Sequence, residues 1–87
     1  MATALASAKL SVIIPAYNEA LLIQGVLEVL RQVGLLDEII VVDDGSSDGT
    51  LETIEKIAKE DTRMRVIRHP NNLGKGQAVF TARQTTQ

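Results

Sequence analysis

The segment Val41-Val42-Asp43-Asp44-Gly45-Ser46-Ser47-Asp48-Gly49-Thr50 carries the strongest signal in this sequence. Two adjacent carboxylates stand where an apolar strand runs into a Gly/Ser turn, and a helix is expected just beyond. An unpaired buried carboxylate costs several kcal/mol or takes up a proton, so acids at the end of a buried strand need a reason. In a chain of alternating strands and helices, this position is where open α/β sheets bind their ligands. The plainer alternative is that Asp43 and Asp44 only cap a turn and a helix.

The composition indicates one globular domain, or part of one, with an aliphatic core. Of the 87 residues 45% are hydrophobic, but only one Tyr, one Phe and no Trp are present. Val, Ile, Leu and Ala must therefore fill the interior, as is typical of a parallel sheet covered by helices. A domain of this length buries only about 60–65% of its unfolded surface, which makes it marginally stable if it folds alone.

Charge and cysteine content exclude several functions. The net charge is −2, and the most basic stretch, residues 63–75, lacks interleaved aromatic side chains, so we expect no nucleic-acid binding. The absence of cysteine excludes a disulfide framework and a thiolate metal site. No apolar run reaches the about 18–20 residues that span a membrane. Residues 1–8 lack the pattern of a signal peptide and are expected to form a disordered leader. We therefore expect a cytoplasmic location.

The hydrophobic pattern predicts the order β-α-β-α-β-α. Strands are expected at residues 10–14, where Pro15 ends the run, at residues 38–43, and at residues 64–68. The second strand is apolar on both faces and requires cover on both sides, whereas the third is more polar and is expected near a sheet edge. Right-handed crossovers would join these strands into one parallel sheet.

The helices between the strands are predicted from apolar residues at helical spacing. The first is expected to be capped by Asn18 and to stop at Gly34. Its expected buried face comprises Leu22, Val26, Val29, Leu30 and Val33. The second is expected to be capped by Ser47 or Asp48. Its expected buried stripe comprises Leu51, Ile54, Ile57 and Ala58. A last helix is expected to begin near Gly74–Gly76.

Three polar turns follow the predicted strands, at residues 15–19, 43–46 and 72–76. A parallel sheet would bring them together at one edge, where their side chains and amides suit a nucleotide. Tyr17 could stack on a base, and a carboxylate could accept a base N–H or a ribose hydroxyl. Glycine amides and Lys75 could approach a phosphate. The alternatives are a packing role for Tyr17 and a solvated Lys75. His69, before Pro70, is expected to be a loop residue and not a ligand.

Several common sites are excluded by their missing motifs. The first strand is not followed by G-x-G-x-x-G, and the loop at residues 74–76 is not a P-loop. No G-x-S-x-G is present, so Ser46 and Ser47 are not elbow nucleophiles. A phosphoacceptor receiver domain would carry acids after its first strand, where this chain has Pro15 and Ala16.

Taken in order, residues 10–19, 38–50 and 71–78 resemble the three opening signatures of the family 2 glycosyltransferases. These are inverting nucleotide-sugar enzymes with the GT-A fold. The resemblance implies a three-layer, Rossmann-like parallel sheet that forms the N-terminal, nucleotide-binding portion of a GT-A fold over residues 9–87. It also implies a nucleoside diphosphate sugar, UDP- or GDP-linked, as the donor, and a lipid phosphate or polysaccharide as the acceptor. The full-length parent would then work at the cytoplasmic face of a membrane.

The resemblance assigns a nucleotide-binding role to eight residues. They are Pro15, Ala16, Tyr17, Glu19, Asp43, Asp44, Gly74 and Lys75. Residues 15–17 would line the nucleoside pocket, and Glu19 would contact the base or ribose side. Asp44 would accept the uracil N–H, and Asp43 would support it or the ribose. Residues 74–75 would lie beside the base and the diphosphate.

The sequence departs from the family pattern at its end. In the family a fourth strand leads to Asp-x-Asp, which holds Mg²⁺ or Mn²⁺ on the diphosphate, whereas this sequence stops at Gln87. We therefore expect no catalytic residue and no metal ligand within it, and no turnover by the isolated chain. The alternative is a non-catalytic α/β module that associates with itself through an unpaired sheet edge, or with a C-terminal partner segment.

Overall fold

The computed structural model describes residues 10–74, 76–77 and 80. In chain order, the elements are β1 (Ser11–Ala16), α2 (Ala20–Arg31), β2 (Glu38–Asp44), α3 (Thr50–Ala58) and β3 (Met64–His69). The leader expected at residues 1–8 lies outside the described residues. So does most of the last expected helix, of which Gly76, Gln77 and Phe80 are described and are helical.

The three strands form one parallel sheet in the order β1-β2-β3, as the alternating pattern predicts. Every residue of the central strand β2 is buried, because its apolar side chains point to both faces and both faces are covered. The register pairs Ala16 of β1 with Asp43, and Asp44 with His69 of β3. The ends of all three strands therefore lie at the same edge of the sheet.

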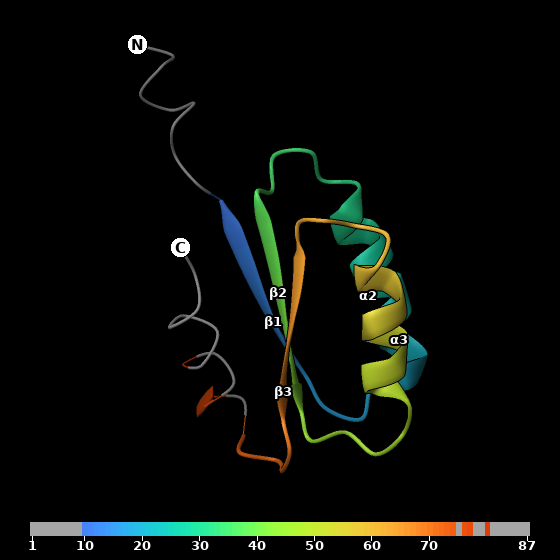
Figure 1. Cartoon of the computed structure of the whole chain (residues 1–87), viewed down its shortest axis with the longest axis vertical. Helices are drawn as coiled ribbons and strands as arrows, with labels where there is room; N and C mark the ends of the chain where they lie inside the picture. The colour runs from blue at the N-terminus through green and yellow to red at the C-terminus, as the bar shows by residue number, and fades with distance from the viewer. Residues whose placement is uncertain (1–9, 75, 78–79, 81–87) are drawn as a thin grey trace.

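Both long helices cover one face of the sheet (Figure 1). The core on this face joins Ile39 and Val41 of β2 to side chains from both helices. On the other face Ile40 and Val42 are buried, and the described helical residues near the C-terminus lie on this side (Figure 1). The α/β class with a parallel sheet is confirmed.

The predicted buried face of α2 is wrong except at Leu30. The residues that α2 buries are Ile23 and Leu27, with Leu30 packed beside them. Leu22 is 66% exposed and Val29 is 66% exposed, although both belong to a series at helical spacing. The helix carries two apolar series on adjacent faces, and periodicity alone cannot decide which of them meets the sheet.

Several predicted element ends also need correction. β1 continues through Pro15 to Ala16, because a proline is tolerated on an edge strand, where its missing N–H need not join a ladder. Helix α2 begins after Glu19, which makes no side-chain cap, and ends at Arg31 instead of Gly34. The carbonyl groups at this end are satisfied by a distant side chain.

That side chain is Arg63, in the turn before β3. Its guanidinium donates to the carbonyl oxygens of Arg31 at 2.7 Å, Val33 at 2.8 Å and Leu36 at 3.1 Å. Asp61 accepts two further hydrogen bonds from the same group, at 3.1 and 2.9 Å. The pair therefore fastens the end of α2 and the entry to β2 from the amino edge of the sheet, opposite the polar turns.

Candidate functional site

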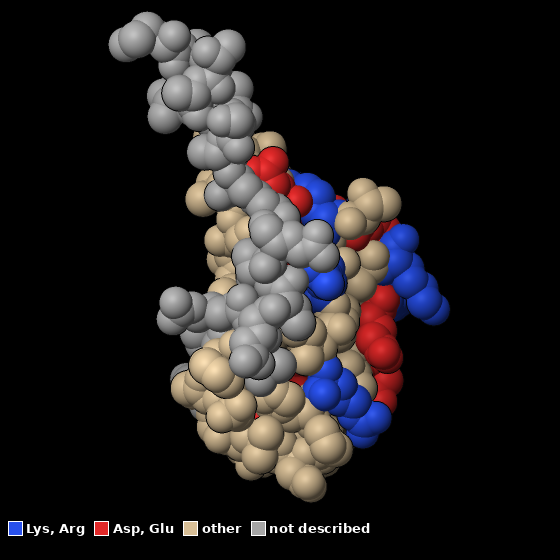
Figure 2. Space-filling view, turned by 60° about the vertical axis from the view of Figure 1, so that its left-hand side comes forward, with Lys and Arg blue, Asp and Glu red and all other residues tan. Residues whose placement is uncertain are grey.

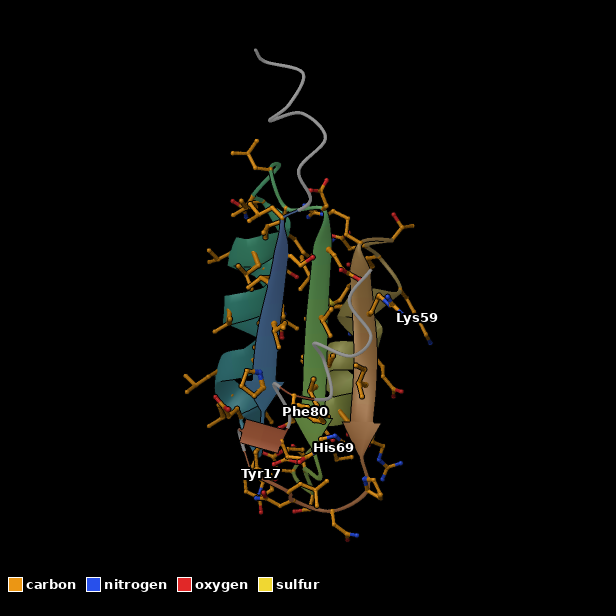
Figure 3. All side chains as sticks on the ribbon, turned by 90° about the vertical axis from the view of Figure 1, so that its left-hand side faces the viewer. Tyr17, Lys59, His69 and Phe80 are labelled. Atoms are coloured by element: carbon orange, nitrogen blue, oxygen red, sulfur yellow. The ribbon has the colours of Figure 1, made fainter. Side chains whose placement is uncertain are left out.

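Three loops meet at the carboxyl edge of the sheet. They follow β1, β2 and β3, and comprise residues 17–19, 45–49 and 70–74. Tyr17 and His69 come from the first and third strand ends, and Figure 3 shows both at this edge, on either side of β2. The sheet therefore gathers the three sequence segments that were expected to form one site.

Asn18 joins the first loop to the second. Its backbone N–H donates to Ser46 Oγ at 2.9 Å, and its side-chain Oδ1 accepts from Ser47 N–H at 2.9 Å. Asn18 adopts a positive φ of 49°, a conformation that asparagine tolerates better than most residues. The sequence predicts that Asn18 caps α2, but its side chain contacts the neighbouring loop instead.

The amino ends of the two helices are joined in the same way. Thr50 Oγ1 accepts from the backbone N–H of Glu19 at 2.8 Å, and Asp48 Oδ2 accepts from that of Ala20 at 3.2 Å. The expected cap of α3 is replaced by Gly49. Asp48 Oδ1 accepts from Thr50, and this hydrogen bond, opposed by partial burial, lowers the pKa of Asp48. The loops after β1 and β2 therefore accept hydrogen bonds from each other's amide groups, which holds the two loops together.

The third loop lies directly against Gly45. This glycine has a φ of +79°, and a Cβ atom placed on it would lie 2.7 Å from the carbonyl carbon of Asn71 and from the nitrogen of Asn72. Real Cβ atoms do not approach backbone atoms so closely. Only glycine therefore allows the loop after β3 to cross over the turn after β2.

Asp44 lies where the third loop crosses, and it is only 3% exposed. Its Oδ1 accepts from Leu73 N–H at 2.9 Å and contacts His69 Nδ1 at 3.0 Å, while its Oδ2 accepts from Gly74 N–H at 2.8 Å. Burial alone would raise the pKa of this carboxyl. The hydrogen bonds from Leu73, His69 and Gly74 outweigh burial and hold its pKa below the usual 3.8. Asp44 is therefore an ionised, buried acceptor.

Asp43 has different surroundings. It is fully buried, its Oδ2 accepts from Ser46 N–H at 3.3 Å, and its Oδ1 has no hydrogen-bond partner among the described residues. Because strand residues alternate between faces, Asp43 shares the helix-covered face with Val41, and Asp44 points to the other face. The two neighbouring carboxylates therefore do not lie together in one pocket.

A shallow hollow borders Asp44. It is lined by Pro15, Ala16, Tyr17 and Asp44, four of the eight residues expected to bind a nucleotide. Tyr17 is 42% exposed, so a ligand in the hollow can reach this residue. The side chain of Glu19 accepts a hydrogen bond from Tyr17 N–H at 3.3 Å, within the same loop.

The remaining predicted residues are placed in part. Gly74 lies against Asp44 with a φ of +91°, while Lys75 falls outside the described residues. Figure 2 shows mainly uncharged surface at the lower end of the molecule, where the three loops lie. No group of three or more His, Cys, Asp or Glu side chains among the described residues could hold a metal ion.

Two residues of the site were missed in the sequence. The sequence predicts a loop position for His69, but this residue ends β3 and is buried beside Asp44. Extending the third strand by one residue would have paired it with Asp44. Thr50 is fully buried and joins both helix ends, a role that no local pattern in the sequence indicates.

Comparison with known proteins agrees with this geometry. The sequence model described as Glycosyl transferase family 2 matches residues 11–86, and the chain belongs to this family. An uncharacterized glycosyltransferase of Haemophilus influenzae is 40% identical over 70 residues, covering 79% of this chain and 28% of that protein. A dolichyl-phosphate beta-glucosyltransferase of Saccharomyces cerevisiae is 40% identical over 80 residues, covering 80% of this chain and 24% of that protein.

A solved structure shares the fold. It is the mannosyltransferase PcManGT from Pyrobaculum calidifontis in complex with GDP-Man and Mn²⁺, with a TM-score of 0.79 and 28% identity. The match covers 93% of this chain and 26% of that one. The chain therefore has the fold of the corresponding part of a GT-A glycosyltransferase, and it spans about a quarter of the length of these three relatives. In the described part of the chain, no helix is long and apolar enough to cross a membrane.

Proposed function

We propose that residues 9–87 form the nucleotide-sugar-binding part of an inverting glycosyltransferase. The donor is a UDP- or GDP-sugar, and the acceptor is a lipid phosphate or a growing polysaccharide at the cytoplasmic face of a membrane. The observation that carries this proposal is the ionised carboxylate of Asp44, held by backbone amides beside the hollow that Tyr17 lines. A buried, fixed acceptor next to an accessible aromatic ring suits the N–H edge and the flat face of a nucleobase.

The same edge offers a place for the diphosphate. Gly74 has no side chain to block a phosphate, and Lys75 supplies a positive charge in the adjacent position. In this proposal the base lies over Asp44 and the diphosphate extends toward the loop at residues 74–76.

The names of related proteins support the substrate classes. The yeast relative is named for dolichyl phosphate, a lipid phosphate, and a relative from Campylobacter jejuni is named for an undecaprenol-linked acceptor. The solved structure contains GDP-Man. We carry over the classes, a nucleoside diphosphate sugar and a lipid-linked acceptor, without choosing one sugar.

A divalent metal belongs to the proposal only for a full-length enzyme. The solved relative contains Mn²⁺. The described residues of this chain offer no cluster of three ligands, and Asp43 and Asp44 point to opposite faces of the sheet. These residues do not fit a metal site, so the chain's own contribution is to bind and orient the nucleotide.

Calorimetric titration of the 87-residue chain with UDP and with GDP tests the proposal. Replacing Asp44 by Asn preserves the shape of the side chain but removes its charge, and we expect at least about tenfold weaker binding. Asp37→Asn is the matched control, because Asp37 accepts from Leu10 N–H at the opposite edge of the sheet. Equal affinities of the wild type and Asp44→Asn for both nucleotides would refute the role of Asp44.

A second candidate function is self-association. The outer edge of β1 has no partner strand among the described residues, and α2 exposes a continuous apolar series beside it. Leu22, Val26 and Val29 of this helix follow the 4-3 spacing of a coiled-coil seam, which fits a second copy of the same helix. Light scattering should then show a dimer that Val29→Lys dissociates. A monomer at all accessible concentrations would exclude this candidate.

A further inference from the structure

His69 is a buried titratable residue that the proposed function does not use. It ends β3, pairs in register with Asp44, and places its Nδ1 3.0 Å from Asp44 Oδ1. The two side chains share the face of the sheet that is opposite α2 and α3, and Figure 3 shows His69 at the edge where Tyr17 also lies. Its imidazole therefore contacts the carboxylate that is proposed to read the base.

The chemistry of the pair fixes which nitrogen carries the proton. The amides of Leu73 and Gly74 donate hydrogen bonds to Asp44 and help to keep its carboxylate ionised. An ionised carboxylate can only accept hydrogen bonds. A contact of 3.0 Å between Nδ1 and Oδ1 is therefore a hydrogen bond only if Nδ1 is protonated. The imidazole does not need a positive charge for this role, since the neutral Nδ1–H tautomer is sufficient.

A count of lone pairs shows what this leaves open. A carboxylate offers about four acceptor positions, two on each oxygen. Leu73 N–H and His69 Nδ1–H occupy both positions on Oδ1, while Gly74 N–H occupies one on Oδ2. Among the residues that the structure describes, no donor fills the second acceptor position on Oδ2. Asp44 also lines the hollow beside Tyr17, which is where a ligand could reach it.

We propose that His69 is a positioning residue, which saturates Oδ1 and fixes the carboxylate so that Oδ2 presents a single acceptor to the nucleobase. This inference rests on the proposed nucleotide-binding role of Asp44. Such an acceptor selects bases with a ring N–H, such as uracil and guanine, and rejects bases with an unprotonated ring nitrogen at that position. Without His69 the amides of Leu73 and Gly74 would still hold both oxygens, but a second acceptor position would open on Oδ1, so the base would no longer meet a single acceptor.

Nucleotides with a blocked ring nitrogen provide the test. UDP and GDP are compared with 3-methyluridine diphosphate and 1-methylguanosine diphosphate on the full 87-residue chain. The wild type should bind at least one parent nucleotide about tenfold or more tightly than its methylated analogue, since the analogue leaves the charged acceptor unpaired. His69→Leu, which fills the space without a donor, should reduce that ratio below about threefold. His69→Asn, whose side-chain amide can donate from near the Nδ1 position, should restore it.

A variant of Tyr17 separates the positioning role of His69 from a general loss of nucleotide binding. Tyr17→Leu removes the proposed stacking surface, so it should weaken binding of the parent and the methylated nucleotide alike and leave their ratio unchanged. If His69→Leu kept the wild-type ratio of parent to methylated nucleotide affinity, the role of His69 would be overturned and that of Asp44 would stand. If the wild type bound the parent and the methylated nucleotides equally well, base recognition by Asp44 would be overturned instead.

The hydrogen bond itself can be tested without any variant. Long-range ¹H–¹⁵N NMR of the wild type distinguishes the two imidazole tautomers, and the inference requires Nδ1 to carry the proton at neutral pH. A neutral imidazole protonated only at Nε2 would refute the proposal even if His69→Leu fails to fold.

Discussion

Gly45→Ala gives the sharpest test of how the site is assembled. The added Cβ would lie 2.7 Å from two backbone atoms of the neighbouring loop, Asn71 C and Asn72 N, and backbone atoms cannot rotate away as a side chain can. The loop must therefore move, or the turn must change conformation. Because Leu73 and Gly74 follow directly in the same loop, their hydrogen bonds to Asp44 must change with it.

The chain supplies a matched control in Gly49. This glycine has a φ of +94°, close to the +79° of Gly45, but a Cβ on it would have nothing within 4 Å. A left-handed conformation costs a non-glycine residue about 1–2 kcal/mol, which applies to both substitutions. Overpacking adds about 1–3 kcal/mol, which applies only to Gly45. We therefore expect a loss of about 1–2 kcal/mol for Gly49→Ala and about 2–5 kcal/mol for Gly45→Ala.

Chemical denaturation monitored by far-UV circular dichroism measures both losses, and titration with UDP or GDP measures their effect on the site. A domain of this length is stable by roughly 4–13 kcal/mol, so the difference between the two variants is a measurable fraction of the total. Nucleotide affinity should fall in Gly45→Ala and change little in Gly49→Ala. Equal losses of stability in the two variants would show that the close approach of the third loop is not what requires glycine at position 45.

Three further predictions concern charge and buried hydrogen bonds. The folded-state pKa values of Asp44 and Asp61 are lowered, so these carboxylates stabilise the fold above the unfolded pKa of about 3.8, and this contribution is lost as the pH falls through the folded values. Denaturation curves should therefore show a constant free energy of unfolding above about pH 5 and a decline below about pH 4. A free energy of unfolding that rises on acidification would contradict this. Arg63→Gln should cost about 2 kcal/mol in the same assay, against at most about 0.5 kcal/mol for the exposed Arg68→Gln, and equal effects would rule out the guanidinium as the fastener of α2. Thr50→Val should lower the stability by about 1–3 kcal/mol because it leaves the part-buried amide of Glu19 without its acceptor, while Thr50→Ser should retain most of the stability. An unchanged stability of Thr50→Val would refute the link between the helix ends.

The fold could be predicted largely because its central strand is unambiguous. Residues 39–42 are apolar on both faces, so they require a sheet covered on both sides, and the helical segments before and after this strand lead to parallel strands. The buried face of α2 could not be predicted in the same way. Ile23 and Leu27 differ from Leu22 and Val26 by a rotation of about one residue around the helix, and only the position of the sheet decides between them.

The site was predictable in its location and less so in its contacts. The carboxyl edge of a parallel sheet brings strand ends together whatever their distance in sequence, which is why residues 15–17, Asp44 and Gly74 could be assigned to one place. The partners of Asp44 depend instead on the register between β2 and β3. A one-residue error at the end of β3 was enough to miss His69, because register determines which side chains face each other.

The pair Asp43-Asp44 shows how the pleat of a strand gives two identical neighbouring residues different surroundings. Adjacent strand residues point to opposite faces, so the two carboxylates cannot share a ligand on one face of the sheet. Asp43 points beneath the helices and accepts from the turn at Ser46, which favours a structural role. Asp44 points to the face that carries His69 and the hollow, where three donors hold it in place. The sequence leaves both roles open for the pair. The geometry favours the role of a turn cap for Asp43 and that of a binding carboxylate for Asp44.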